Sequence, residues 1–88
     1  MKSITVFGFE VTSEVQAKLI AKMKQMEVFC LADIEAEAVT HGVPMFRLER
    51  GSRVRVATRT ADRLLQRERR AGNIKYGRDG WRWTGEEK

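Results

Sequence analysis

The residues that build covalent and metal sites are scarce in this chain. It has one cysteine, Cys30, and one histidine, His41, among 88 residues. A single cysteine cannot form an internal disulfide, which is typical of a reducing cytosolic environment, and the two residues are too few for a zinc site. No nucleophile is paired with a base, and no glycine loop is arranged to cradle phosphate. We therefore expect neither enzymatic activity nor a cofactor, and no small-molecule ligand is indicated.

Long apolar runs are lacking as well. No run approaches the ~18 residues of a membrane span, and the N-terminus lacks the pattern of a signal peptide. The expected protein is soluble and cytoplasmic, or nucleoid-associated if it binds DNA, with no membrane partner. With 42% hydrophobic and 33% charged residues, the 88 positions suit one small globular domain spanning 1–88.

Acidic residues are few relative to basic ones in the second half of the chain. Residues 1–46 carry four lysines and six acidic residues, a net charge of −2, whereas residues 47–88 carry thirteen basic and six acidic residues, a net charge of +7. Eleven of the thirteen are arginines, whose planar guanidinium suits phosphates and guanine edges. An anionic partner is therefore expected for the C-terminal half.

Residues 3–11 are predicted to form a β segment. Apolar residues alternate along it and are interrupted at Phe7-Gly8. Glycine accepts the positive φ of a hairpin turn, but Phe7 is a poor residue for the other turn position. The pattern therefore permits either a tight hairpin or a single bent strand. Phe7 and Phe9 are expected in the core and are also the candidate contact of a homodimer.

A first helix is predicted over about residues 13–26, where apolar residues recur at helical spacing. Ser13 and Gln16 fit a capping box, in which the two side chains satisfy backbone donors of the first turn. The methionines of this helix are expected to fill the core.

A second helix is predicted over about residues 31–41, after a short β-prone segment at 27–30 that is consistent with the strand that often precedes helix 2 in winged domains. Gly42 provides a common C-terminal signal. Cys30 occupies the expected cap position, so the helix begins there or one or two residues later with Asp33 as its cap. His41 is assigned a structural role at the end of this helix, where the dipole favours a cation.

Residues 43–56 permit two interpretations. Apolar residues alternate with arginines on both sides of Arg50-Gly51, which favours a small hairpin. The alternative places Ser52 as an N-cap and runs the third helix over residues 53–71. The firm part of this helix is predicted to begin near Ala57, with residues 53–56 undecided.

The helical period is clear from Ala57 onward. Ala57, Ala61, Leu64, Leu65 and Ala71 fall on one side at 100° per residue. Glu68 falls near this apolar side and is expected at its rim, beside a basic neighbour. The opposite side carries Arg59, Arg63, Gln66, Arg67 and Arg70.

Residues 73–84 predict a β-hairpin. Asp79-Gly80 is a strong turn signal, and Gly77 permits a four-residue loop instead. Alternation places the apolar side chains on one face, toward the helices, and leaves the basic residues for the other face and the tip. The first set is Ile74, Tyr76, Trp81 and Trp83, and the second is Lys75, Arg78 and Arg82.

The sequence ADRLLQRERRAGNIKYGRDGWRW, residues 61–83, resembles the recognition helix and wing of bacterial and phage winged helix-turn-helix proteins. In these proteins a leucine-bearing helix ends in Ala-Gly and is followed by an Ile-x-Tyr strand and a tryptophan-rich return strand. The chain is particularly similar to small phage- or prophage-encoded proteins of this type, over about residues 12–84. The resemblance implies an α+β winged-helix fold with three helices, a C-terminal hairpin wing and an N-terminal β segment. The ten-residue connection before the third helix departs from the usual short turn, which leaves the docking angle of that helix open.

We expect binding to double-stranded DNA by a phage or bacterial transcriptional regulator. The third helix would enter the major groove, and the hairpin would lie on the phosphate backbone. Arginine recognises guanine bidentately, and aspartate accepts a hydrogen bond from cytosine. The base-reading candidates are Arg55, Thr58, Arg59, Asp62 and Arg63, preceded by Arg53, and the candidates for phosphate or the minor groove are Arg67, Arg70, Lys75, Arg78 and Arg82.

A protein-interaction module is the alternative, because some winged domains bind proteins or RNA. A phage adaptor or inhibitor would use the same arginines against an acidic protein partner. Loss of DNA retention with intact folding, on mutation of Arg59 and Arg63, would favour DNA binding. A homodimer through the N-terminal β segment is expected because one such domain supplies an interface of only about 600–1,000 Å².

Overall fold

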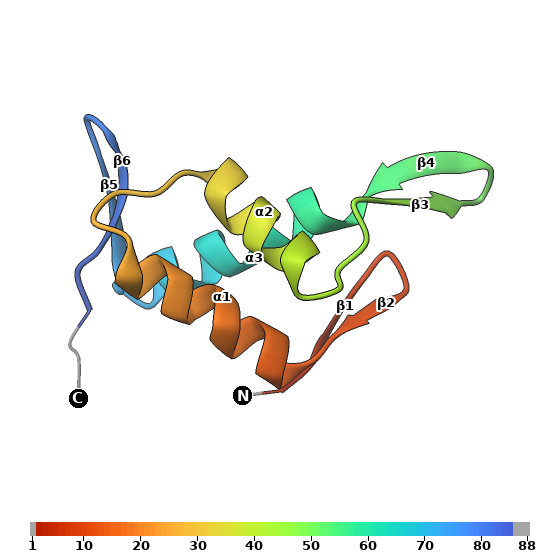
Figure 1. Cartoon of the computed structure of the whole chain (residues 1–88), viewed down its shortest axis with the longest axis horizontal. Coiled ribbons are helices and arrows are strands. Elements are labelled where there is room, and N and C mark those ends of the chain that lie inside the picture. The colour runs from red at the N-terminus through yellow and green to blue at the C-terminus, as the bar shows by residue number, and fades with distance from the viewer. Residues whose placement is uncertain (1, 86–88) are drawn as a thin grey trace.

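The computed structural model describes residues 2–85, and the remaining positions of the predicted 1–88 domain lie outside it. Over these residues the fold is α+β, with three helices and three two-stranded antiparallel sheets (Figure 1). Each sheet is a hairpin, and hairpins alternate with helical segments along the chain. The elements are β1 (Ile4–Val6), β2 (Phe9–Val11), α1 (Ser13–Gln25), α2 (Leu31–Thr40), β3 (Phe46–Glu49), β4 (Ser52–Arg55), α3 (Val56–Arg70), β5 (Ile74–Gly77) and β6 (Gly80–Trp83).

The helices enclose one apolar core, to which each contributes a stripe of buried side chains. Leu19 of α1, Ile34 of α2 and Leu64 of α3 are fully buried. Val11 of β2 closes the core at one end, and Phe29, in the loop before α2, closes it near hairpin β5–β6. The helical spacing of apolar residues therefore identified the core faces of the helices, except at Ala71, which is the exposed C-cap of α3.

Residues 4–11 form a hairpin rather than a single bent strand. Ile4 pairs with Val11 and Val6 with Phe9, around a turn at Phe7 and Gly8. Both turn residues have positive φ, 49° and 79°. Positive φ at both central residues is the turn that matches the twist of a tight hairpin.

Helix α1 begins at Ser13 as predicted, but its N-cap is a different residue. Thr12, not Ser13, is the N-cap, and its hydroxyl accepts a hydrogen bond from Val15 N at 3.2 Å. Gln16 does not serve a capping box, because its side chain turns inward and is fully buried. The predicted pairing of Ser13 with Gln16 is therefore wrong.

Helix α2 begins directly after Cys30. Asp33 does not occupy the cap position, but its carboxylate accepts a hydrogen bond from Cys30 N at 2.8 Å. The helix ends at Thr40, one residue before the predicted end, and His41 is the C-cap. His41 Nε2 lies 2.9 Å from a carboxylate oxygen of Glu37, one turn earlier, which supports a structural role for this histidine.

Residues 46–55 form a hairpin, and helix α3 begins at Val56 rather than at residue 53. The first two amides of α3 find backbone acceptors outside the helix: Val56 N donates to Met45 O at 3.1 Å and Ala57 N to Pro44 O at 3.0 Å. Because these carbonyls satisfy amides that a helix start leaves unpaired, the helix needs no capping side chain. The same two bonds close the base of hairpin β3–β4.

Hairpin β5–β6 turns at Arg78-Asp79, one residue before the predicted Asp79-Gly80. Gly80 instead begins β6 and is buried, with φ of 136°. Only part of the predicted inward face packs on the helices. Ile74 is buried, whereas Tyr76, at 67% exposure, is not, and its ring contacts only the edge of Trp81 in a T-shaped pair.

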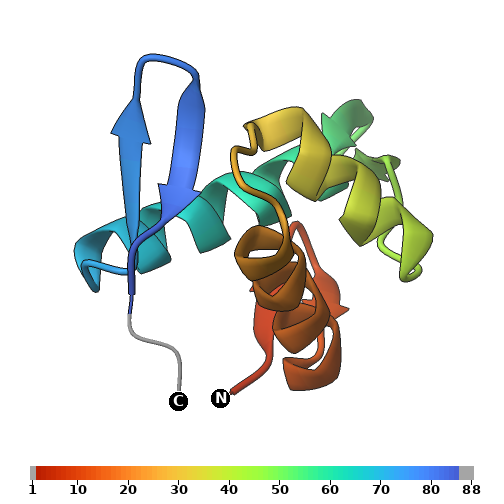
Figure 2. The ribbon, with the colours of Figure 1, turned by 60° about the vertical axis from the view of Figure 1, so that its left-hand side comes forward.

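One rung joins hairpin β5–β6 to the segment before α2. Phe29 N donates to Trp81 O at 2.9 Å, and Trp81 N donates to Phe29 O at 2.8 Å. This antiparallel bridge places the β-prone segment 27–30 beside β6. Figure 2 shows the hairpin rising beside the last turns of α3.

The two later hairpins lie at opposite ends of the molecule. Hairpin β3–β4 extends from the start of α3 and hairpin β5–β6 from its end (Figure 1). The molecule is elongated along this direction, with extents of 41, 27 and 22 Å. Helix α3 is thus flanked by one basic hairpin on each side.

Candidate nucleic-acid interface

The solvent-facing side of α3 carries a stripe of long polar side chains. Arg59, Arg63, Gln66 and Arg70 follow one another at spacings of four, three and four residues, so they share one face of the helix. Together with Asp62 they line a hollow of about 490 Å³ that extends to Ile4 of β1. The structure therefore brings five of the predicted site residues, Arg59, Asp62, Arg63, Arg67 and Arg70, together around one hollow.

Arg63 is held in place by the N-terminal hairpin. Its Nη1 donates a hydrogen bond to the backbone oxygen of Thr5, in β1, at 2.8 Å. The contact spans 58 positions in the sequence, and no local pattern predicts it. One nitrogen of the guanidinium is thereby held by the protein, while the side chain remains exposed to solvent.

Arg59 and Arg70 are the uncommitted cations of the stripe. Within residues 2–85, neither makes a hydrogen bond or an ion pair to the protein, and both are exposed. The nearest acid in the stripe is Asp62, which lines the same hollow as both arginines. An excess of positive charge over negative charge therefore remains on this face of the helix.

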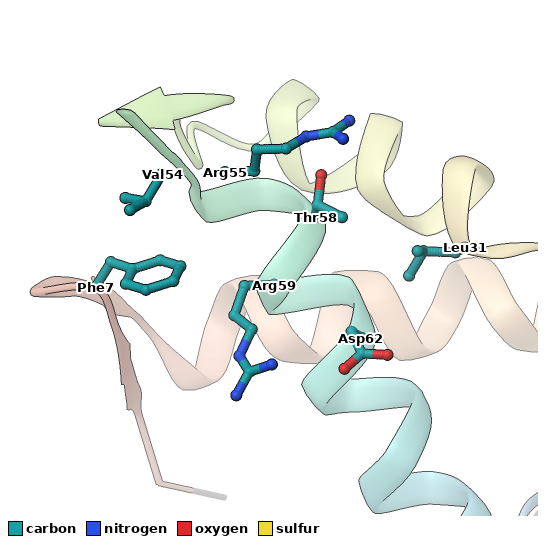
Figure 3. A pocket seen from close by; sticks show the side chains of 7 residues that line it. All are labelled: Phe7, Leu31, Val54, Arg55, Thr58, Arg59 and Asp62. Atoms are coloured by element: carbon teal, nitrogen blue, oxygen red, sulfur yellow. The ribbon is translucent and has the colours of Figure 1, made fainter. Parts of the chain in front are cut away.

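A second hollow, of about 390 Å³, lies at the start of α3 and has apolar walls. Figure 3 shows Phe7 and Val54 on one side of the first turns of the helix and Leu31 on the other, with Arg59 and Asp62 between them. Phe7 is one of the two non-glycine residues with positive φ among those described, and its turn conformation places the ring at this hollow. The candidate dimer residue Phe7 is thus exposed beside α3, whereas Phe9 packs against the core.

Two predicted base-reading residues have a protein partner that the sequence reasoning missed. The hydroxyl of Thr58 donates a hydrogen bond to a carboxylate oxygen of Glu35, in α2. Arg55 Nη2 lies 3.7 Å from the same carboxylate oxygen. The side chain of Glu35 is only 15% exposed and lies between α2 and α3. It reduces the charge that Arg55 presents.

Arg67 belongs to an internal polar chain. Its Nη1 donates to Gln16 Oε1 at 2.7 Å and its Nε to Glu68 Oε2 at 3.1 Å. Gln16 Nε2 continues the chain to Lys2 O at 2.7 Å, and Glu68 Oε1 accepts from Asn73 at 2.8 Å. Arg67 was predicted as a phosphate contact, but its guanidinium ties α1, α3 and the approach to β5 together.

Glu68 lies where the helical period places it, beside Arg67 at the apolar side of α3, and it is more buried than a rim position. A buried carboxylate requires hydrogen-bond donors, and Arg67 and Asn73 supply them. Gln16 is likewise buried with its hydrogen-bonding groups satisfied: its side chain donates to Lys2 O and Val11 O and accepts from Arg67. A polar residue on an apolar helical stripe is the sequence signal that pointed to this network.

The predicted basic residues of the C-terminal hairpin are exposed. Lys75 and Arg82 are cross-strand partners, so their side chains leave the same face of the hairpin. Arg82 Nη2 lies 3.8 Å from Asp79, a surface pair of small energetic weight. Arg78 is in the turn. Two like charges facing each other on a strand pair are unfavourable unless an anion lies between them.

Arg53 and Arg55 belong to β4, not to the third helix. The Arg53 guanidinium lies 4.9 Å from the centre of the Phe46 ring in β3. The predicted site is therefore divided among three elements: hairpin β3–β4, the exposed stripe of α3, and hairpin β5–β6.

No helix among the described residues is long and apolar enough to cross a membrane. Nor does the described part of the chain gather three or more histidine, cysteine or acidic side chains into a group that could hold a metal ion. Comparisons with protein-family models, curated proteins and solved structures find no match to this chain.

Proposed function

We propose that this chain is a winged-helix domain that binds double-stranded DNA, with α3 in the major groove and hairpin β5–β6 on the phosphate backbone. The observation that carries the proposal is the arginine stripe of α3, in which Arg59 and Arg70 face solvent without a partner among residues 2–85. Long cationic side chains on one helix face reach base edges and phosphates when the helix enters a major groove.

The winged-helix part of the proposal is supported by the bridge between Phe29 and Trp81. It pairs one residue of the segment before α2 with β6, at the place where the first strand of a winged domain is expected to meet the wing. A regulator of bacterial or phage transcription is the role that a DNA-binding domain of this size suits best. The inserted hairpin β3–β4 departs from a plain helix-turn-helix.

Within the proposal, the residues have distinct roles. Arg59, Asp62 and Arg63 are assigned to read bases. The hydrogen bond of Arg63 to Thr5 O orients its guanidinium for this role. Arg70 is assigned to phosphate. The remaining phosphate contacts are assigned to Lys75, Arg78 and Arg82, whereas Arg67 stabilises the scaffold.

The test is equilibrium binding of fluorescent duplexes of mixed sequence by the purified chain. If six or more phosphates are neutralised, affinity should fall about 10³-fold or more between about 50 and 200 mM salt. Arg70→Ala should lower the slope of log affinity against log salt by about 1. Lys18→Ala, which removes the same charge from the exposed side of α1, is the matched control and should leave binding unchanged. Absent or salt-insensitive binding by a folded protein would overturn the proposal.

A protein-interaction module is the second candidate, and the apolar hollow beside Phe7, Leu31 and Val54 favours it. Such a hollow suits an apolar side chain of a protein ligand. Folded protein that retains no duplex at about 50 mM salt would favour this candidate over DNA binding.

A homodimer through hairpin β1–β2 is also part of the proposal. Phe7 is its better contact, because it is exposed and Phe9 is partly buried against the core. Light scattering after size exclusion should give a dimer for the wild type and a monomer for Phe7→Ser. A monomer in both cases would remove the dimer and leave the DNA-binding proposal in place.

A further inference from the structure

Hairpin β3–β4 has an outward face on which Arg55, at its base, lies 3.7 Å from Glu35 of α2, while Phe46 and Leu48 remain exposed. The strand register places Phe46 opposite Arg55 and Leu48 opposite Arg53, so these four side chains share one face. Phe46 is 45% exposed and Leu48 is 73% exposed, the highest value among the large apolar residues described as exposed. Large apolar side chains clustered on a protruding strand pair are a feature that monomeric proteins usually avoid unless they bind something.

The opposite face and the base attach the hairpin to the body. Val54 is partly buried and packs against the core cluster. The guanidinium of Arg47 lies over Gly8 of the first hairpin, with Nη1 3.3 Å from the position of a Cβ there. At the base, Val56 N bonds to Met45 O and Ala57 N to Pro44 O, so the start of α3 sets the direction of the hairpin. The outward face is thus presented by a fixed arm.

The arm is strongly basic. Residues 46–55 contain four arginines, at positions 47, 50, 53 and 55, and one acid, Glu49, a net charge of +3. Arg50 has φ of 54° and Gly51 of 82° in the two-residue turn. Asn, Asp or Gly is preferred at the first of these turn positions, so an arginine there places a cation at the tip at the cost of a less favourable backbone. The stacking of Arg53 on Phe46 holds a second guanidinium on the outward face.

An apolar residue surrounded by arginines on a two-stranded arm matches the chemistry of a DNA minor groove. Narrow minor grooves attract arginine, and proteins that bind there insert leucine or phenylalanine between base steps and bend the duplex. The four-residue strands of the arm extend about 13 Å. Half a turn of B-DNA is about 17 Å, roughly 4 Å more than the strands span. The arm therefore reaches the adjoining minor groove only with its two-residue turn and the Arg50 side chain at its tip.

We propose that hairpin β3–β4 is a minor-groove arm whose Leu48 wedges between base pairs and bends duplex DNA. The inference rests on the proposed function of α3 and goes beyond it, because it adds a second groove, a deformation of the DNA and a residue responsible for it. Arg50 and Arg53 follow the phosphates on the two sides of the wedge.

The test is energy transfer between a donor and an acceptor on the two ends of one duplex. Wild-type protein should raise the transfer efficiency at saturation. Leu48→Ser and Leu48→Ala should remove most of that rise and weaken binding by less than about tenfold, with the salt slope unchanged because the charge is unchanged. Val39→Ser replaces an exposed apolar residue of α2 outside the proposed interface and should leave the rise intact. Circular dichroism of each variant checks the fold.

The outcomes separate the arm from the function on which it rests. Duplex binding by the wild type with no change in energy transfer, or an equal rise with Leu48→Ser, would overturn the arm and leave DNA binding by α3 standing. Failure of the folded wild type to bind duplex would remove both. Vesicles containing phosphatidylserine supply the other anionic surface: binding to them that is lost in Leu48→Ser, together with unchanged bending of DNA, would make the hairpin a lipid-binding arm and overturn the proposal.

Discussion

Hairpins β3–β4 and β5–β6 share one plan and differ in what surrounds them. Each pairs two four-residue strands around a two-residue turn, and each projects from one end of α3. In β5–β6, Ile74 and Gly80 are buried and Trp81 is bonded to Phe29. In β3–β4, Phe46 and Leu48 are exposed, and the hairpin is tied to the body at its base and through Arg47 and Val54 on its other face.

This difference separates two uses of the same local structure. An isolated two-stranded hairpin is marginally stable in water, so tertiary contacts must supply what it lacks. Hairpin β5–β6 obtains them through Ile74, which is buried in the core, and through Trp81 and Trp83, which pack against it. Hairpin β3–β4 obtains them only at its base and on one face, so the apolar residues on its other face do not contribute to folding. The following changes test this contrast, from the largest expected effect to the smallest.

Replacing Phe29 by alanine should have the largest effect. Phe29 is 1% exposed and carries the bridge to Trp81, so the cavity left behind should lower the free energy of unfolding by about 3–5 kcal/mol. Phe46→Ala, which deletes the same kind of side chain from hairpin β3–β4, should cost less than about 1 kcal/mol because Phe46 is already exposed. Urea unfolding followed by circular dichroism measures both. Equal losses would mean that β3–β4 is as much a part of the core as β5–β6.

Alanine at Gly80 should have the next largest effect. Its Cβ would lie 2.9 Å from Phe29 O, and its φ of 136° is one that alanine rarely adopts, so we expect a loss of about 3 kcal/mol. Gly51→Ala is the counterpart in β3–β4. Its φ is also positive, at 82°, but nothing lies within 4 Å of the added atom, and the loss should be about 1 kcal/mol. Thermal unfolding distinguishes the two, and a larger loss at Gly51 would contradict the contrast.

Amide hydrogen exchange should show the same difference in stability between the two hairpins without any mutation. The amides of Phe29 and Trp81 should exchange only through global unfolding, because both are bonded across the core. Paired amides in β3–β4 should exchange at least about 100-fold faster, through local opening of the hairpin. Exchange followed by NMR resolves individual amides. Protection of β3–β4 equal to that of Phe29 would show that the arm opens only with the whole domain.

Arg50→Asn should have the smallest effect on the free energy of unfolding, and it should raise that free energy rather than lower it. Asparagine tolerates the positive φ of this turn better than arginine does, so the variant should be more stable by about 0.5 kcal/mol. Arg53→Asn removes the same charge from a strand position and also the contact with Phe46, so it should bring no gain. Chemical unfolding at matched ionic strength compares them. An equal gain in both variants would assign the effect to relief of charge repulsion rather than to the backbone.

The elements that could be predicted from the sequence are those whose residues carry a local signal. The apolar period of Ala57, Ala61, Leu64 and Leu65 placed the buried face of α3 correctly. The position of Gly42 indicated the end of α2, which the structure places at Thr40. In both cases the property that decides the structure, side-chain burial or backbone conformation, is a property of the residues themselves.

The start of α3 could not be predicted for a physical reason. Val54 and Val56 satisfy both an alternating strand and the first turn of a helix. The choice depends on the carbonyls of Pro44 and Met45, which accept the first helical amides from across the hairpin. A helix whose first amides bond to backbone carbonyls 11 and 13 positions earlier needs no capping side chain, so the sequence carries no such signal.

The candidate site was only partly predictable for a related reason. Arg59 and Arg70 follow from the helical period alone. Arg67 has the same spacing and a different role, because Gln16 lies 51 positions away and its side chain accepts a hydrogen bond from Arg67. Tyr76 alternates in step with Ile74, but the helices support only the beginning of the hairpin, so the alternation continues beyond the surface that would bury it.

The placement of one hairpin at each end of α3 has a consequence for how copies would share a DNA molecule. The long axis that joins the hairpins measures 41 Å, which on B-DNA would correspond to about 12 base pairs at about 3.4 Å each. This length exceeds one helical turn of about 10.5 base pairs. On the proposed mode of DNA binding, with the long axis along the duplex, two copies on the same side would collide at sites one turn apart. About 21 base pairs would then be the shortest spacing that accommodates both.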